Sequence, residues 1–210
     1  MKKQIKILII ILGIVIIGVI ILINKENSKV RVCLDAGHGG EEVGAVLGKR
    51  YEKEDTLKVT KLVERKLKKK NVKVIMTRKK DKDVSLQERC TIANQKKADF
   101  FVSIHRNSAT VGNGIEIWCG SSKEEKDTKL ANHILTELET TNIQQNRGIK
   151  YGSIEGESSD YYVLKNTNMP SCLIELGFIS DEKDNQLLDN NLEEYAQAIA
   201  DGIVKTIENT

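Results

Sequence analysis

The hydrophobic pattern divides the chain into an apolar N-terminal segment and a longer part that mixes apolar and polar positions. Residues 7–23 are 17 consecutive apolar or Gly positions, and Lys2, Lys3 and Lys6 precede them. At 1.5 Å per residue this segment spans about 25 Å, close to the shortest helix that crosses a bilayer. We expect a transmembrane anchor at the cell membrane, with residues 1–6 in the cytoplasm and everything after residue 23 on the outer side.

A cleaved signal peptide is the alternative interpretation of the same segment, and cleavage would make the protein secreted. Cleavage needs small residues at the processing site, and residues 22–26 contain none. A mature N-terminus near Asn24 would favour the signal peptide. Residues 24–29 are polar and are expected to form a linker, which leaves residues 30–210 as one domain that is long enough to bury a substantial core.

Apolar runs and amphipathic stretches alternate through residues 30–210. The last stretch has the clearest helical period, because its apolar residues recur at positions i, i+3, i+4 and i+7. Residues 140–160 are polar and predict a loop, and residues 161–164 are a candidate strand. This alternation is typical of an α/β domain with a mostly parallel central sheet and helices on both faces. The predicted strands are 30–34, 72–76, 100–104, 114–119 and 171–176, and the predicted helices are 53–70, 85–96, 123–139 and 192–207.

Composition and cysteine spacing exclude several classes of protein. The formal net charge is +3 and aromatic residues make up 4% of the chain, too few for the aromatic stacking surface of a single-strand nucleic-acid binder. Cys33, Cys90, Cys119 and Cys172 form no C-x-x-C pair, which argues against a zinc ribbon or a thioredoxin-like redox motif. Most of them lie in apolar runs, which favours buried free thiols, although their even number leaves disulfides open.

Two histidines follow apolar strands. His38 follows residues 30–35 and His105 follows residues 100–104. Sites in α/β sheets form beyond the carboxyl ends of strands, so both imidazoles could reach one site. Zinc hydrolases often use two His and one carboxylate, and Glu52, Glu54 and Asp55 are all candidates for the carboxylate. A His in a Gly-rich loop could instead cap a turn.

Glu175 is the candidate general base and acid. It lies near the end of the apolar strand 171–176, where a buried carboxylate is costly unless it is paired or functional. His133 lies in a polar helix and is expected to be solvated. Gly39 and Gly40 are expected to leave room for a bulky substrate beside His38.

Several ordered motifs carry a family resemblance. The chain resembles the zinc-dependent N-acetylmuramoyl-L-alanine amidase family, which has the Amidase_3 catalytic domain. The resemblance covers nearly all of residues 30–207. The matching stretches are residues 34–40, Glu52-Lys53 with Leu57, Thr77-Arg78 with Asp81, residues 85–89, Ala93-Asn94, residues 103–107, Val163-Leu164 and residues 169–178.

The resemblance implies a sheet of about six strands and hydrolysis of the amide between the lactyl group of N-acetylmuramic acid and L-alanine in peptidoglycan. It implies that His38, Glu52 and His105 hold one Zn²⁺ per chain and that Glu175 is catalytic. Glu52 is selected because the family's Glu-Lys pair precedes a Leu by the spacing found here.

One position departs from the family pattern. The family usually has Ala after its second zinc His, and this chain has Arg106. This departure makes Arg106 a candidate substrate-binding residue. Asn107 beside it and Arg147 in the polar loop are further candidates for substrate binding, and Arg89 is a candidate structural or substrate-binding residue.

Other roles remain open on sequence alone. The same domain occurs in germination-specific amidases, which act in the formation of muramic lactam in the spore cortex. A non-catalytic peptidoglycan-binding or amidase-activating protein is an alternative of a different class, and a metallopeptidase that cuts the peptide cross-links is another. The expected partners are the glycan-peptide strands of peptidoglycan and, through residues 7–23, the cytoplasmic membrane, while a regulatory protein partner is not identifiable.

Overall fold

The computed structural model describes residues 29–154, 156 and 159–210, and every element below lies in the compact unit Arg31–Thr210. The strands are β1 (Arg31–Ala36), β2 (Val46–Leu47), β3 (Arg50–Tyr51), β4 (Lys73–Met76), β5 (Phe100–Asn107), β6 (Ile115–Cys119), β7 (Asn146–Tyr151) and β8 (Ser171–Phe178). The helices are α2 (Glu52–Lys69), α3 (Leu86–Gln95), α4 (Glu125–Thr140), α5 (Tyr162–Lys165), α6 (Glu182–Asn190) and α7 (Leu192–Glu208).

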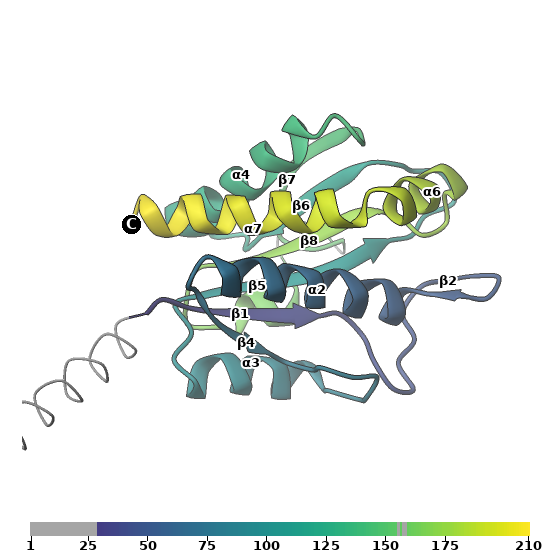
Figure 1. The fold of residues 1–210 in the computed structure, drawn as a ribbon. Coiled ribbons are helices and arrows are strands. Elements are labelled where there is room, and N and C mark those ends of the chain that lie inside the picture. Colours follow the sequence, from purple (N-terminus) through teal and green to yellow (C-terminus); the bar gives the residue numbers. More distant parts are fainter. Residues whose placement is uncertain (1–28, 155, 157–158) are drawn as a thin grey trace, which may run out of the picture. The chain divides into compact units, whose positions relative to one another are not determined.

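Six strands form one sheet in the order β4-β1-β5-β8-β6-β7. Strands β4, β1, β5 and β8 are parallel, β6 is antiparallel to β8, and β7 is parallel to β6. Helices α2, α4 and α7 cover one face and α3 the other (Figure 1). The prediction of a mostly parallel α/β sheet with about six strands and helices on both faces is confirmed.

The central strands are apolar because both of their faces are covered. Every residue of β8 is buried, and so is every residue of β1 after Arg31. Such strands appear in a sequence as continuous hydrophobic runs, not as an alternation. All four cysteines are buried free thiols, as their apolar surroundings indicated.

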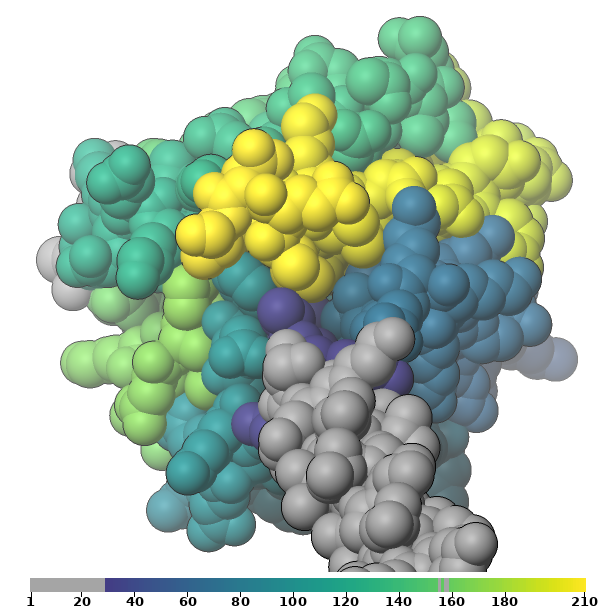
Figure 2. Space-filling model, turned by 60° about the vertical axis from the view of Figure 1, so that its left-hand side comes forward, coloured from purple at the N-terminus to yellow at the C-terminus, as the bar shows by residue number. Residues whose placement is uncertain are grey.

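Helix α7 lies between α4 and α2 on the surface of the domain (Figure 2). It buries Tyr195, Ile199 and Ile203 at helical spacing. Gly202 is also buried, and a Cβ atom at this position would lie 2.4 Å from the Cα of Ile134 in α4. The backbones of α4 and α7 can approach this closely because Gly202 has no side chain.

Three local predictions were wrong. Residues 140–160 contain the edge strand β7, and the candidate strand 161–164 is mostly the short helix α5. Strand β5 continues to Asn107, so that His105 lies within the strand and not after it. The predicted start of a helix at residue 85 agrees with the structure, because Ser85 caps α3 and its Oγ accepts a hydrogen bond of 3.2 Å from the Glu88 N–H.

The proposed anchor, residues 7–23, lies outside the described residues. Within the described part of the chain, no helix combines the length and the apolar character that a bilayer span requires.

Replacing Gly202 with Ala tests the contact between α4 and α7. Ala favours a helix over Gly by about 1 kcal/mol, but its Cβ would collide with the α4 backbone. We expect the free energy of unfolding to fall by roughly 1–3 kcal/mol in denaturant titrations, because overpacking outweighs propensity. Gly120→Ala is the control, since its Cβ would meet nothing closer than 3.7 Å. A more stable Gly202→Ala variant would contradict this packing.

Candidate metal centre and active site

His38 lies in the loop after β1 in a left-handed conformation, with φ of 60°. Non-Gly residues rarely adopt this region, and such strain is concentrated at functional sites. Its two ring nitrogens face different carboxylates. Nδ1 lies 3.0 Å from Glu42 Oε1, and Nε2 lies 3.1 Å from Glu52 Oε1. The loop therefore fixes both the position and the orientation of the ring.

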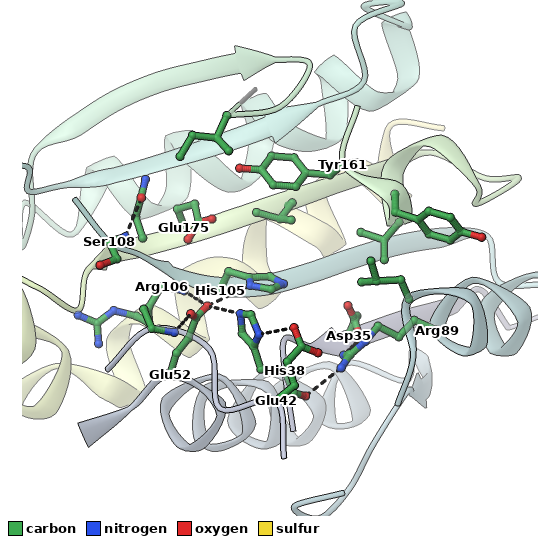
Figure 3. A pocket seen from close by; sticks show the side chains of 17 residues that line it. Asp35, His38, Glu42, Glu52, Arg89, His105, Arg106, Ser108, Tyr161 and Glu175 are labelled. Atoms are coloured by element: carbon green, nitrogen blue, oxygen red, sulfur yellow. Dashed lines mark hydrogen bonds and ion pairs between the residues drawn. The ribbon is translucent and has the colours of Figure 1, made fainter. Parts of the chain in front are cut away.

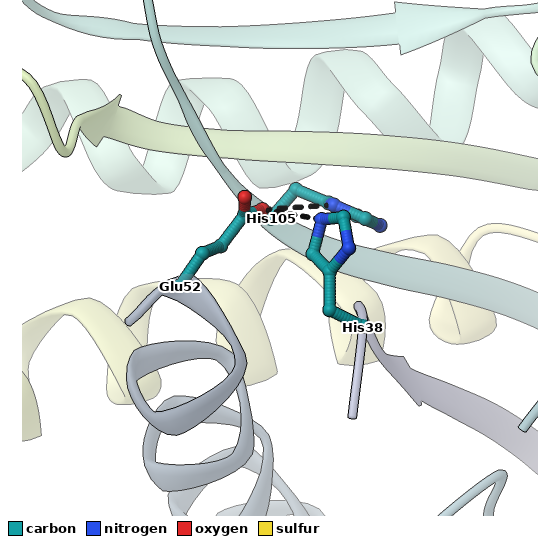
Figure 4. Close-up of side chains that lie close together, drawn as sticks. All are labelled: His38, Glu52 and His105. Atoms are coloured by element: carbon teal, nitrogen blue, oxygen red, sulfur yellow. Dashed lines mark hydrogen bonds and ion pairs between the residues drawn. The ribbon is translucent and has the colours of Figure 1, made fainter. Parts of the chain in front are cut away.

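Glu52 is the first residue of α2, and its carboxylate is the centre of the site (Figure 4). Its Oε1 lies 3.0 Å from His105 Nδ1 and accepts a hydrogen bond of 2.9 Å from the Arg106 N–H. Its Oε2 accepts a hydrogen bond of 2.9 Å from the Ala45 N–H. Burial would raise the pKa of Glu52, but the two histidines lower it below its ordinary value. This carboxylate is therefore held ionised.

Strand β5 places the ring of His105 against that of His38, with ring centroids 4.9 Å apart and planes at 80°. Gly37 leaves space for this ring, because a Cβ at position 37 would lie 2.3 Å from the His105 ring. Gly44 leaves space for the side chains of His38 and Glu52, since a Cβ at position 44 would lie 2.6 Å from the ring of His38 and 2.7 Å from Glu52 Oε2. The site depends on these two glycines.

The three side chains fit a metal ion. One ligand atom from each of His38, Glu52 and His105 lies within 4.8 Å of the others. The measured separations of 3.0 and 3.1 Å between ring nitrogens and Glu52 Oε1 are close to the roughly 3.3 Å between ligand atoms in tetrahedral zinc sites. Two imidazoles and one carboxylate are also the donor set of many catalytic zinc sites.

Glu175 faces the same pocket from β8 (Figure 3). It is only 7% exposed and is the direct strand neighbour of His105. Its Oε2 is buried and has no hydrogen-bond partner among the described residues. Burial raises the pKa of Glu175 well above its ordinary value, and the charges of Glu52 and Glu116 raise it further. A buried carboxylate in this state is a strong base that is free to contact a bound molecule.

Glu116 is a second buried acid beside Glu175, its partner across β6 and β8. Its carboxylate accepts hydrogen bonds from Asn107 Nδ2 (2.8 Å), Trp118 Nε1 (3.1 Å) and Arg147 Nε (2.8 Å). Two of the candidate substrate-binding residues thus bind Glu116, Arg147 through an ion pair and Asn107 through a hydrogen bond.

Arg89 and Arg106 have internal partners. Arg89 is 2% exposed and forms an ion pair of 2.7 Å with Asp35, and it donates to the backbone oxygen of His38. Arg106 is 3% exposed and its guanidinium contacts Asp55 and Asn185. Both residues are among those that line the pocket, but these contacts support a structural role for Arg89 and bind the guanidinium of Arg106 to Asp55 and Asn185.

The expected role of Gly39 and Gly40 was wrong. A Cβ on Gly39 would lie 2.4 Å from the Lys82 carbonyl oxygen, and one on Gly40 would lie 2.2 Å from the Asp83 carboxylate. Both glycines pack against the loop after β4 and leave no room for a substrate. His133 lies outside the site, on α4, with Nδ1 3.0 Å from Thr206 Oγ1.

Sequence reasoning missed Glu42 and Glu116. Glu116 carries the signal that identified Glu175, since it is an isolated acid within an apolar strand. Glu42 lies four residues after His38 in a loop whose path the sequence does not predict. The sequence therefore offers no signal for the contact between Glu42 and the His38 ring.

A pocket of about 330 Å³ lies over the three candidate ligands and Glu175. Tyr161, Tyr162 and Ile154 also line this pocket. Three side chains that could hold a metal ion, a buried carboxylate and an adjoining pocket are the combination typical of a metal-dependent hydrolase.

The comparisons with known proteins agree with this class. Residues 32–209 match the family N-acetylmuramoyl-L-alanine amidase (Amidase_3). The chain belongs to this family of hydrolytic enzymes. It is also 39% identical to the protein YqiI of Bacillus subtilis, over 85% of this chain and 83% of that protein.

Three named relatives differ in how much of their own length this chain spans. The chain is 33% identical to the N-acetylmuramoyl-L-alanine amidase LytC of Bacillus subtilis over 82% of its own length, but spans only 34% of LytC. The catalytic domain of CwlV from Paenibacillus polymyxa has 33% identity and a TM-score of 0.76, over 86% of this chain and 99% of that one. The CwlD amidase of Clostridioides difficile, solved with the GerS lipoprotein, has 29% identity and a TM-score of 0.79, over 87% of this chain and 100% of the CwlD chain.

Metal binding should depend on pH through His38. Burial would lower the pKa of His38, but Glu52 and Glu42 raise it above 6.5. In the metal-free protein this ion pairing stabilises the fold below pH 6.5 and is lost as pH rises through the raised pKa. A metal needs the neutral ring, so its affinity should fall about tenfold for each pH unit below that pKa.

The measurement is the increase in melting temperature on adding Zn²⁺ at pH 5.5 and at pH 8. We expect a larger increase at pH 8, the same behaviour in His133→Ala, and no increase in His38→Ala. An increase that is independent of pH, or one that survives in His38→Ala, would show that the metal binds elsewhere.

Proposed function

We propose that this protein hydrolyses the amide bond between the lactyl group of N-acetylmuramic acid and L-alanine in peptidoglycan. One zinc ion bound by His38, Glu52 and His105 is the cofactor, and Glu175 is the general base and acid. The observation that carries the proposal is the convergence of these four side chains on one pocket, in a chain that belongs to the amidase family.

Hydrolysis of an amide needs both the metal ligands and Glu175. An amide resists hydrolysis because its carbonyl is a poor electrophile and its amine is a poor leaving group. A zinc ion held by the three ligands would supply Lewis-acid chemistry, polarising the carbonyl and making water more acidic. Two of the three ligands are already oriented for this task by other protein groups, His38 by Glu42 and Glu52 by the Arg106 N–H and the Ala45 N–H.

Glu175 moves the proton. Its carboxylate takes a proton from water as the water oxygen attacks the carbonyl carbon, and it then donates that proton to the amine nitrogen as the C–N bond breaks. The products are a lactyl carboxylic acid on the glycan and a free amino group on L-alanine. In the metal-free protein the pKa of Glu175 is raised by burial and by the charges of Glu52 and Glu116, which makes the group a stronger base than an exposed carboxylate and an acid once it is protonated.

Replacing Glu175 with Gln should remove this proton transfer while keeping the shape of the side chain. General acid–base catalysis contributes about 10²- to 10⁴-fold, so we expect amidase activity on purified sacculi to fall by at least about a hundredfold with zinc content unchanged. Glu193→Gln is the matched control, since Glu193 pairs with Lys66 on the surface. The assay counts new L-alanine amino groups and identifies the glycan strands by mass spectrometry.

Amidase activity that survives both removal of zinc by a chelator and the Glu175→Gln substitution would contradict this mechanism. The mass spectra also separate a metallopeptidase, which would leave part of the peptide on the glycan. A non-catalytic wall-binding protein would release nothing.

A germination-specific role in the spore cortex is the narrower candidate. The similarity to the CwlD amidase supports it, and that amidase was solved together with the GerS lipoprotein. If this chain has the narrower role, its activity should require a partner protein or should occur only in sporulating cells. Activity of the purified chain alone on vegetative sacculi favours general wall remodelling.

We also propose that residues 7–23 anchor the protein in the cytoplasmic membrane with residues 30–210 on the outer side, joined through the linker 24–29. The support is the uncharged apolar run after three lysines. The test is N-terminal sequencing of the protein from both the membrane fraction and the medium. A chain that begins near Asn24 and is recovered from the medium would mean a secreted protein.

A further inference from the structure

The sheet is irregular next to the candidate metal ligand His105. Strands β5 and β8 pair His105 with Glu175 and then Asn107 with Phe178, so that β8 has one extra residue at this point. Gly177, within the extra segment, has φ of 74°. Regular strands direct successive side chains to opposite faces, but here His105 and Arg106 both contact the first turn of α2, at Glu52 and at Asp55.

Arg106 is held by three elements at once. Its Nη1 donates to Asp55 Oδ2 at 2.7 Å on α2, its Nη2 donates to Asn185 Oδ1 at 2.8 Å on α6, and its Nε lies 3.4 Å from the Gly177 carbonyl oxygen on β8. The side chain is 1% exposed. Figure 3 shows the guanidinium directed away from His38 and Tyr161. A planar guanidinium fork is suited to such simultaneous contacts, and a lysine is not.

The backbone of the same residue binds the metal-ligand carboxylate. The Arg106 N–H donates to Glu52 Oε1 at 2.9 Å. Glu52 and Asp55 are three residues apart on α2, and therefore on one side of the helix. Arg106 thus grips the first turn of α2 at two points, with its N–H on Glu52 and its guanidinium on Asp55.

A second arginine, Arg50, also contacts Asp55. Arg50 donates to Asp55 through Nε (2.7 Å) and Nη2 (3.1 Å), and its two terminal nitrogens also contact Asp189 of α6 at 2.8 and 2.9 Å. Asp55 therefore lies between two guanidinium groups. Loss of Arg106 would leave Asp55 paired with Arg50, so the fold has a reason to survive that substitution.

We propose that the Arg106 side chain is a positioning residue that fixes Glu52 for metal binding, by locking β5 to the first turn of α2 through Asp55. The proposal rests on the proposed function, because it assigns a task at the same metal centre. It replaces the interpretation of Arg106 as a substrate contact. It also gives a physical meaning to the departure from the Ala that the family resemblance leads one to expect at this position.

The test measures zinc affinity of the full-length, metal-stripped protein in detergent, by competition with a chromophoric chelator. Residues that orient metal ligands typically contribute about 10- to 100-fold to affinity. We expect Arg106→Ala to weaken zinc binding by about tenfold or more, and Arg106→Lys, which keeps the charge but not the fork, to weaken it less. Asn185→Ala should also weaken binding, because it removes one of the contacts that hold the guanidinium.

Arg65→Ala, on the helix α2 that also carries Glu52 and Asp55, is the matched control. It also removes an arginine and an ion pair, with Glu193 at 3.2 Å, but its side chain is 62% exposed. We expect its zinc affinity to equal that of the unsubstituted protein. Melting of the metal-free forms is measured in parallel, and Arg106→Lys and Asn185→Ala decide the outcome if Arg106→Ala does not fold.

Two results would overturn the proposal. The first is unchanged zinc affinity in the Arg106 and Asn185 variants with only a lower melting temperature, which would make the network merely structural. The second is unchanged zinc affinity with a higher KM for sacculi, which would restore the substrate contact. An unsubstituted protein that binds zinc without amidase activity would refute the proposed function alone, whereas one that binds no zinc would refute both.

Discussion

A single buried carboxylate, that of Glu52, joins the three parts of the fold that make the site. It is 3% exposed, and it contacts the loop after β1 through His38 and strand β5 through His105 and the Arg106 N–H. An ionised carboxylate at this depth is costly unless its lone pairs are satisfied. The contacts that satisfy it are therefore also the contacts that bring the two imidazoles together, and the close approach depends on the absence of a side chain at Gly37 and Gly44.

The two acids at the centre of the site have opposite environments. His105 and His38 lower the pKa of Glu52, while burial and the charges of Glu52 and Glu116 raise the pKa of Glu175. Carboxylates whose pKa values are driven apart in this way usually divide the chemical tasks between them. Here the division supports the proposal that Glu52 binds the metal and that Glu175 transfers the proton. Glu116 contributes to it, because Asn107, Trp118 and Arg147 bind its carboxylate beside Glu175.

Strong periodicity and continuous apolar runs made most of the sheet and helices predictable. Helix α7 repeats its apolar residues over its full length, and β1 and β8 are buried on both faces. Strand β7 escaped prediction because its residues are polar and only half-buried at the edge of the sheet. Helix α5 was mistaken for a strand because the aromatic and β-branched residues at 161–163 favour strands, while a four-residue helix leaves no period to detect.

The site was predictable to a different degree at each residue. Positions after apolar strands indicated His38 and His105, and an acid in an apolar strand indicated Glu175. Sequence alone did not separate Glu52 from Glu54 and Asp55, since all three lie in one helical turn; the family resemblance selected Glu52. The packing of Arg106 against Asp55 and Asn185 was beyond prediction, because it joins segments that lie 51 and 79 positions apart in the chain.

The most direct test of the central claim is anomalous scattering at the zinc absorption edge from crystals of the protein grown with zinc. We predict one strong peak within bonding distance of His38 Nε2, Glu52 and His105, beside the Glu175 carboxylate. A peak at another place in the molecule, or a structure in which these three side chains point apart when zinc is present, would contradict the account.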